Sequence, residues 1–162
     1  MKPKMDQWYE LEDIDHELMK FAVIIATFHN QFIIIHNKKR GGWEIPGGSR
    51  EEGEPIIHTA SRELFEETGA VRFELTPFGI YEWRGSYGMV FCAEVEELQP
   101  LPAFEIEEIK FEDELPEGMN FGEMFYLFHD KWLERKNWRL TTHSIAIKGN
   151  SNQEMSTFES RS

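Results

Sequence analysis

The sequence predicts an α/β domain in which a mixed β-sheet is covered by helices on its faces. Three observations indicate this class: apolar runs of strand length, two segments with apolar residues at helical spacing, and the order strands, helix, strands, helix. The chain has 162 residues, the length of one ordinary domain. We expect a single domain over residues 1–140 and a polar, loosely held C-terminal tail over residues 141–162.

The first half of the chain predicts a hairpin, a glycine-rich loop and a helix. Residues 18–28 and 31–36 are rich in Ile, Val and Phe and are typical of two adjacent strands. Residues 41–48 contain four glycines, whose conformational freedom we expect the loop to use. Residues 54–68 show helical periodicity, and Gly69 stands where a C-terminal cap belongs.

The second half predicts a second set of strands and a closing helix. Residues 71–83 and 87–95 resemble long strands, and residues 106–111 a short one. Residues 121–135 form an amphipathic helix pattern that would pack on the sheet. Its apolar positions are Phe121, Met124, Phe125, Phe128 and Trp132.

Composition excludes several classes of partner. The 30 acidic residues outnumber the 17 Lys and Arg, giving a formal net charge of −13. The one tight basic run is Lys38-Lys39-Arg40, so neither duplex nucleic acid nor an anionic membrane is an expected partner. The single cysteine rules out an internal disulfide framework, and no apolar run suggests a leader or a span. We therefore expect a cytoplasmic protein.

The informative cluster is a set of three carboxylates on the predicted helix. Glu63, Glu66 and Glu67 are spaced i, i+3, i+4 and share one face. Their mutual repulsion would be relieved by a hard cation, Mg²⁺ or Mn²⁺, which prefers oxygen ligands. Arg62 adjoins the cluster and Glu54 precedes it, so this pair could pin the loop against the helix.

Residues 48–70 resemble the Nudix box. The matching positions are Gly48, Glu54, Arg62, Glu63, Leu64, Glu66, Glu67 and Gly69, while Ala70 is smaller than the usual aliphatic residue. The resemblance implies the Nudix α/β/α sandwich. It also implies a hydrolase that cleaves a phosphoanhydride with the help of Mg²⁺ or Mn²⁺.

Residue roles follow from the resemblance position by position. It implies metal ligation by Glu63, Glu66, Glu67 and the Gly47 carbonyl, catalytic roles for Glu66, Glu67 and Arg62, and structural support from Glu54. Similar proteins carry a further Glu in a loop before a strand, as a ligand or a general base. Glu105 fits that register best, with Glu107 and Glu108 as rivals.

The segment 43–48 resembles that of MutT-type nucleoside triphosphatases. This implies hydrolysis of a purine deoxynucleoside triphosphate such as 8-oxo-dGTP to monophosphate and pyrophosphate. Asn120 would then contact the purine, although a turn or helix cap before residue 121 is the favoured explanation of this residue on its own. Lys39, Arg40 and the backbone of Gly48 would bind the phosphates, unless the two cations belong to a solvated turn.

Other members of the family leave alternatives open. Tyr87 stands where diadenosine polyphosphate hydrolases often carry a tyrosine, and hydrolysis of RNA 5′ ends uses the same chemistry. A non-catalytic Nudix-like binding module is a further alternative, although such modules usually lack one of the box carboxylates. Nudix proteins are often homodimers, but no contact surface is legible in the sequence.

Overall fold

The computed structural model describes residues 6–103, 106–147 and 155–161. Its helices are α1 (Ile56–Thr68) and α2 (Gly122–Arg135), with short 3-10 turns η1 (Leu11–Asp13) and η2 (His16–Leu18). Its strands are β1 (Gln7–Tyr9), β2 (Met19–Phe28), β3 (Gln31–Asn37), β4 (Trp43–Glu44), β5 (Gly47–Ser49), β6 (Ala70–Trp83), β7 (Ser86–Leu98), β8 (Ile106–Glu112), β9 (Thr142–Ile147) and β10 (Met155–Arg161).

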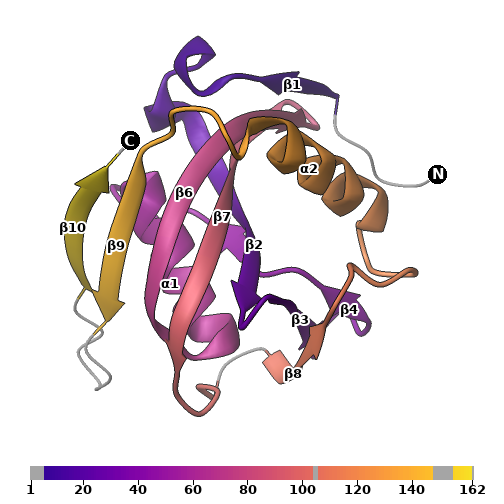
Figure 1. Ribbon diagram of the computed structural model, residues 1–162. Helices are drawn as coiled ribbons and strands as arrows, with labels where there is room; N and C mark the ends of the chain where they lie inside the picture. The colour runs from indigo at the N-terminus through magenta and orange to yellow at the C-terminus, as the bar shows by residue number, and fades with distance from the viewer. Residues whose placement is uncertain (1–5, 104–105, 148–154, 162) are drawn as a thin grey trace.

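The strands form one mixed sheet, as predicted (Figure 1). Their order is β10-β9-β6-β7-β2-β3-β4, while β1 pairs with β6, β5 with β2 and β8 with β3. The central β2 and β7 run parallel, with Val23 opposite Val90, and β6 and β7 form a long antiparallel hairpin. The parallel pair needs a long crossover, which the chain between β2 and β7 provides.

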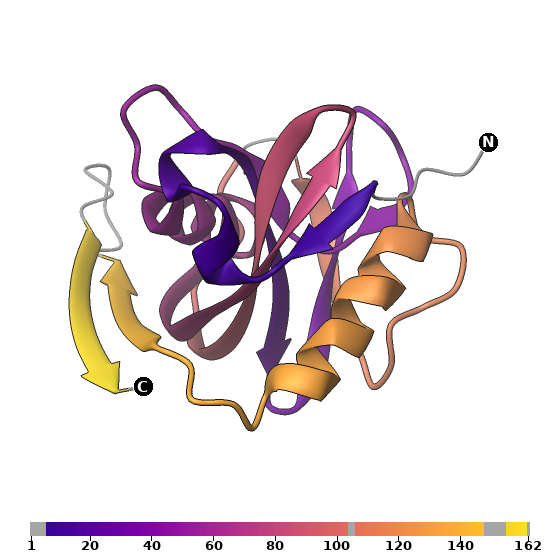
Figure 2. The same ribbon diagram turned by 90° about the horizontal axis from the view of Figure 1, so that it is seen from above.

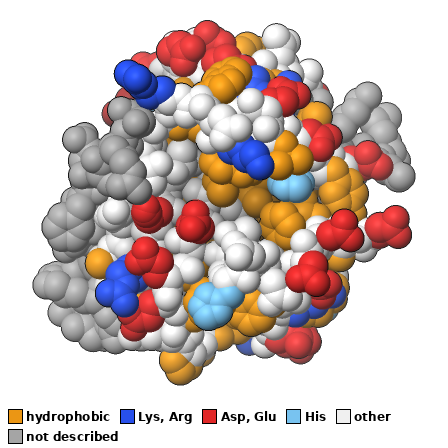
Figure 3. All heavy atoms as spheres, in the orientation of Figure 1, with side chains coloured by type: hydrophobic (Ala, Val, Ile, Leu, Met, Phe, Trp, Pro, Cys, Tyr) orange, Lys and Arg blue, Asp and Glu red, His pale blue; other side chains and the backbone are white. Residues whose placement is uncertain are grey.

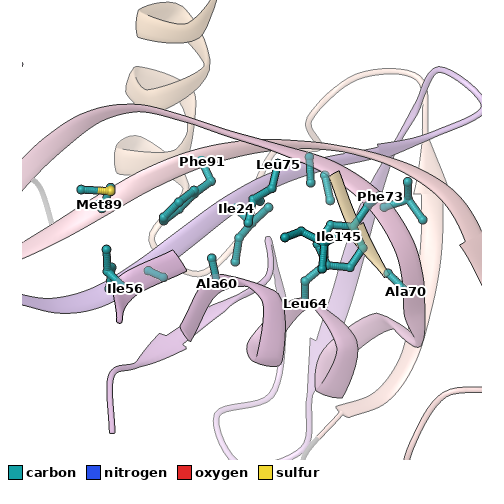
Figure 4. Packing of buried hydrophobic residues seen from close by; sticks show 14 of the residues in the cluster. Ile24, Ile56, Ala60, Leu64, Ala70, Phe73, Leu75, Met89, Phe91 and Ile145 are labelled. Atoms are coloured by element: carbon teal, nitrogen blue, oxygen red, sulfur yellow. The ribbon is translucent and has the colours of Figure 1, made fainter. Parts of the chain in front are cut away.

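The two helices cover opposite faces of this sheet (Figure 2). On one face, Ile56, Ala60 and Leu64 of α1 pack with residues of the central strands (Figure 4). On the other, Phe125 and Phe128 of α2 pack with a second cluster that includes Phe78. This layering is the α/β/α sandwich that the sequence predicts. No helix in the described ranges is long and apolar enough to cross a membrane.

The turn between β2 and β3 and the C-terminal end of α1 form where the sequence predicts them. His29 and Asn30 both have positive φ, 50° and 65°, which makes the two-residue turn between β2 and β3. Gly69 ends α1 with φ 83°, and its N–H donates to the carbonyl oxygen of Phe65 at 2.8 Å. Both turns therefore depend on backbone angles that most residues avoid.

The glycine-rich segment differs from the expected loop. It contains β4 and β5, and Gly47 and Gly48 lie in the extended strand β5 without positive φ. A Cβ at Gly47 would stand 2.6 Å from the carbonyl oxygen of Ala22. Close packing of β5 is therefore the reason for glycine at these two positions, rather than conformational freedom.

The C-terminal stretch also differs from the loosely held tail that we expected. β9 pairs antiparallel with β6, and β10 pairs with β9. Ile145 is 2% exposed and belongs to the α1-side core. The segment Thr142–Ile147 carries only two large apolar side chains, both facing the core, so its strand signal was too weak to outweigh its polar composition.

We expect Ile145→Ala to lower the free energy of unfolding by about 2–4 kcal/mol, because it leaves a cavity in the core. Urea denaturation measures this change. Ser144→Ala, on the neighbouring position of β9, should change stability by less than about 0.5 kcal/mol. Equal stabilities of the two variants would contradict the packing of β9 into the core.

Candidate active site

Arg62 lies at the centre of the site. From α1 its guanidinium forms two bonds with Glu54, Nε to Oε2 at 2.8 Å and Nη2 to Oε1 at 3.0 Å. Nη2 also donates to the carbonyl oxygen of Ser49 at 3.0 Å. The structure thus brings the predicted pair together, and the pair fastens the segment after β5 to the helix.

Electrostatics keep both partners charged. Burial raises the pKa of the Glu54 carboxyl, but hydrogen bonds from Arg62, from the Glu51 N–H and from the Thr59 hydroxyl outweigh burial and lower the pKa to about 2. The hydrogen bond to Glu54 likewise raises the pKa of Arg62 above its ordinary value. The pair is therefore ionised throughout the physiological range.

The same guanidinium faces two of the box carboxylates. Its Nη1 lies 3.0 Å from Glu63 Oε1 and 3.4 Å from Glu66 Oε1. Burial raises the pKa of Glu63 to about 7; Arg62 opposes this rise and the nearby Glu66 carboxylate adds to it. Nη1 also lies 3.9 Å from the exposed carboxylate of Glu51. One cation is thus shared among four carboxylates, and the negative charge at this face of α1 is only partly compensated.

Strand β5 presses against this acidic face. The N–H of Gly47 donates to Glu67 Oε1 at 2.9 Å, and Glu67 is 8% exposed. A Cβ at Gly48 would lie 1.6 Å from Glu63 Oε2. The carboxylate of Glu63 therefore occupies the space that any side chain at position 48 would need.

These groups line one hollow, which we call the carboxylate pocket. Its lining comprises Asn37, Arg40, Gly47, Gly48, Ser49, Arg50, Glu51, Glu63, Glu66 and Glu67. Arg40, Gly47, Gly48 and Ser49 also line a second hollow, the aromatic pocket. The two pockets are therefore adjacent, with β5 and Arg40 between them.

The aromatic pocket is walled by side chains from β2, β6 and the start of α2. The rings of Phe21 and Phe121 meet Trp83 edge-on at 6.4 and 6.1 Å between centroids. An ion pair adds polarity: the exposed side chain of Arg40 binds the buried carboxylate of Glu44 through Nε and Nη2, at 2.7 and 2.8 Å. Glu44 is 4% exposed, and sequence reasoning had not singled it out.

Two predicted phosphate or base contacts lie elsewhere. Asn120 Nδ2 donates to the Gly41 carbonyl oxygen at 2.6 Å and to Glu44 Oε2 at 2.9 Å, which ties the loop to the start of α2. Asn120 lines neither pocket, and neither does Lys39. Arg40 and Gly48, in contrast, line both.

The candidates for an additional ligand or base stand as follows. Glu105 lies outside the described residues. Glu107 pairs with His36 at 3.0 Å and its side chain is 59% exposed, while Glu108 is an exposed residue of β8. Neither lines the carboxylate pocket. Tyr87, considered above for dinucleotide substrates, packs edge-on against Tyr9 at the border of the core.

The predicted metal ligands that the structure describes, Gly47, Glu63, Glu66 and Glu67, share a pocket without forming a closed centre. Among the described residues, no three His, Cys, Asp or Glu side chains converge as a formed metal site would require. The reason is visible in their contacts, because Glu63 and Glu66 turn toward Arg62 and Glu67 binds the Gly47 N–H. A cation entering the pocket would compete with these protein donors for hard oxygen ligands.

Comparisons with known proteins agree with this geometry. The NUDIX domain family matches residues 16–138. A mouse protein, nucleoside diphosphate-linked moiety X motif 6, is 42% identical over 67 residues, which cover 40% of this chain and 21% of the mouse protein. The matched segment thus spans about a fifth of that relative's length.

Solved structures share the fold. The pyrophosphohydrolase BsRppH of Bacillus subtilis superposes with a TM-score of 0.67 and 22% identity, over 85% of this chain and 99% of that one. A NUDIX hydrolase of Nitrosomonas europaea gives a TM-score of 0.59 and 22% identity, over 74% of each chain. The match to the family model covers most of the chain, and the chain therefore belongs to the NUDIX domain family.

Proposed function

We propose that this protein hydrolyses a nucleoside triphosphate, with a purine deoxynucleotide such as 8-oxo-dGTP as the favoured substrate, to the monophosphate and pyrophosphate. The observation that carries the proposal is the adjacency of the two pockets, which share Arg40 and β5. A nucleotide has the same two parts, an aromatic base and an anionic phosphate chain. With the base in the aromatic pocket, its phosphates would reach the carboxylates.

A divalent cation, Mg²⁺ or Mn²⁺, fits the carboxylate pocket. Glu63, Glu66 and Glu67 supply hard oxygen ligands whose negative charge Arg62 compensates only in part, and the close approach of Gly48 to Glu63 leaves no room for a side chain at position 48. We propose these three residues and the Gly47 carbonyl as its ligands, with Glu105 as an additional ligand or base. Such a cation supplies activation of water and screening of phosphate charge.

The chain's own residues would position the substrate. Arg62 holds Glu63 and Glu66 in place from α1, while Glu54 keeps the guanidinium from turning away. Arg40 stands at the junction of the pockets, where a phosphate chain attached to a bound base must pass. Its guanidinium can neutralise a phosphate oxygen there.

The aromatic walls favour a large base, because stacking area grows with ring size. Asn120 contributes to this proposal indirectly, through Glu44 and the loop at Gly41, rather than as a wall of the pocket. Acidic side chains spread over the face of Figure 3, with hydrophobic ones gathered over α2. Such a surface favours a small nucleotide over a long RNA chain.

A substrate panel tests the proposed function. We expect the highest kcat/KM, with Mg²⁺ or Mn²⁺ present, for 8-oxo-dGTP or dGTP, and monophosphate and pyrophosphate as products. The panel also contains ADP-ribose, diadenosine polyphosphates and 5′-triphosphorylated RNA. A preference for one of these would overturn the substrate assignment, and no turnover by folded protein would favour a binding module.

Glu67→Gln should lower kcat by roughly 100- to 1000-fold, as expected when one group that stabilises developing charge is lost. The amide oxygen still accepts the Gly47 N–H, so the melting temperature should change little. Glu117→Gln, an exposed residue before α2, is the matched control. Full activity of Glu67→Gln would contradict its role as a ligand.

Gly48→Ala should weaken Mg²⁺ or Mn²⁺ binding, because the added methyl group would displace the Glu63 carboxylate. Isothermal titration with each metal measures the effect. Gly122→Ala is the control, since its Cβ would meet Tyr126 at an ordinary 3.5 Å. Identical metal affinities of the two variants would show that Glu63 is not a ligand.

A further inference from the structure

Asn37, the last residue of β3, is a polar side chain of the carboxylate pocket that has no assigned role. It is 2% exposed, yet it lines the pocket together with Glu63, Glu66 and Glu67. A primary amide carries one acceptor and two N–H donors, and buried amides normally satisfy both ends. The partners of each end therefore show what the residue does.

The oxygen end holds the loop after β3. Oδ1 accepts hydrogen bonds from the N–H groups of Lys39 and Arg40, at 2.9 and 3.0 Å. Two N–H donors require an acceptor, so the identities of oxygen and nitrogen in this amide are fixed by its contacts. The backbone of Asn37 closes the same loop through bonds with Gly41 and Gly42, at 2.9 and 3.2 Å.

The nitrogen end has no acceptor among the residues that the structure describes. Within the described ranges, no oxygen accepts a hydrogen bond from Asn37 Nδ2. Asn37 Nδ2 is not among the fully enclosed side-chain atoms of the described residues that lack a hydrogen-bond partner. Since the residue is otherwise buried and lines the carboxylate pocket, its N–H groups reach solvent through that pocket.

A donor at this place would act beside Arg40, the cation proposed above to bind phosphate. Glu63, Glu66 and Glu67 repel the oxygens of any phosphate, while Arg62 is engaged by Glu54. Arg50 donates to the carbonyl oxygens of Glu54 and Glu17, at 3.2 and 2.9 Å. A neutral amide with its oxygen anchored presents N–H groups that pair with phosphate and carry no charge for the neighbouring carboxylates to neutralise.

We propose that Asn37 Nδ2 donates a hydrogen bond to a phosphate oxygen of the substrate, so that Asn37 is a substrate-binding residue as well as the anchor of the loop that carries Arg40. The inference rests on the proposed phosphoanhydride chemistry of this pocket. In this proposal Asn37 Oδ1 holds the loop after β3 and Asn37 Nδ2 binds the substrate.

Asn37→Asp separates the two tasks. An oxygen remains for the N–H groups of Lys39 and Arg40, whereas the donor becomes a charged acceptor that faces the phosphate. We expect kcat/KM to fall by about 10- to 100-fold, the range for losing one hydrogen bond to a charged group. The melting temperature should stay within about 3 °C of the wild type.

Two further variants control this result. Asn30→Asp makes the same charge change at the exposed turn before β3 and should leave kcat/KM unchanged. Asn37→Ser keeps a hydroxyl acceptor for the loop but has no amide N–H directed at substrate, and should lose activity without added charge. Wild-type kcat/KM in both Asn37 variants would overturn the proposal and leave Asn37 as a loop anchor alone.

Inorganic pyrophosphate separates this proposal from the proposed function. If the wild type turned over no nucleotide, the proposed function would fail, and calorimetric binding of pyrophosphate with Mg²⁺ would decide the role of Asn37. We expect about tenfold weaker binding by Asn37→Asp than by the wild type. Equal affinities, or no binding by either protein, would refute the phosphate contact.

Discussion

The guanidinium of Arg62 is the contact on which the rest of the site depends. It binds the Glu54 carboxylate with two nitrogens, the Ser49 carbonyl with one of them, and faces three further carboxylates with the third. Its side chain is 17% exposed, so these bonds are largely shielded from water. Removing one partner of such a pair leaves a buried charge uncompensated, which typically costs several kcal/mol. Loss of Arg62 would therefore disturb the segment after β5, helix α1 and the carboxylates on its acidic face at the same time.

Helix α1 has two different faces, an apolar one that packs on the sheet and an acidic one that lines the carboxylate pocket. Ala60 and Leu64 are fully buried against the sheet, whereas Glu63 and Glu66 crowd their charges on the adjoining side. Crowded carboxylates destabilise an isolated helix. The packed face offsets that cost, and Glu67 lies at the boundary, where the Gly47 N–H satisfies it. The acidic face thus carries like charges that local helix stability disfavours, while the core next to it has the expected apolar packing.

Sequence patterns predicted those parts of the protein that depend on local periodicity. The apolar runs placed β2, β3, β6 and β7, and the spacing of Glu63, Glu66 and Glu67 placed them on one side of α1. Contacts between distant segments escaped prediction. Gly48 is glycine because Glu63 fills its space, and Glu44 is buried because Arg40 and Asn120 bind it. Asn37 directly precedes the basic run 38–40, and no local pattern shows that its amide would bind the backbone N–H groups of Lys39 and Arg40.

The parallel pairing of β2 with β7 has a consequence for biosynthesis. β2 is apolar toward both layers, with Ile24 and Ile25 at 0% and 1% exposure, and its parallel partner β7 is synthesised only after β3, β4, β5, α1 and β6. During translation, the edge of β2 that pairs with β7 stays uncovered until residues 86–98 have been synthesised. Pairing across such a distance is slow to form, and an uncovered apolar strand is prone to associate with other chains. A nascent chain arrested between α1 and β7 would carry every carboxylate of the box, yet it would be a candidate for chaperone capture rather than for catalysis.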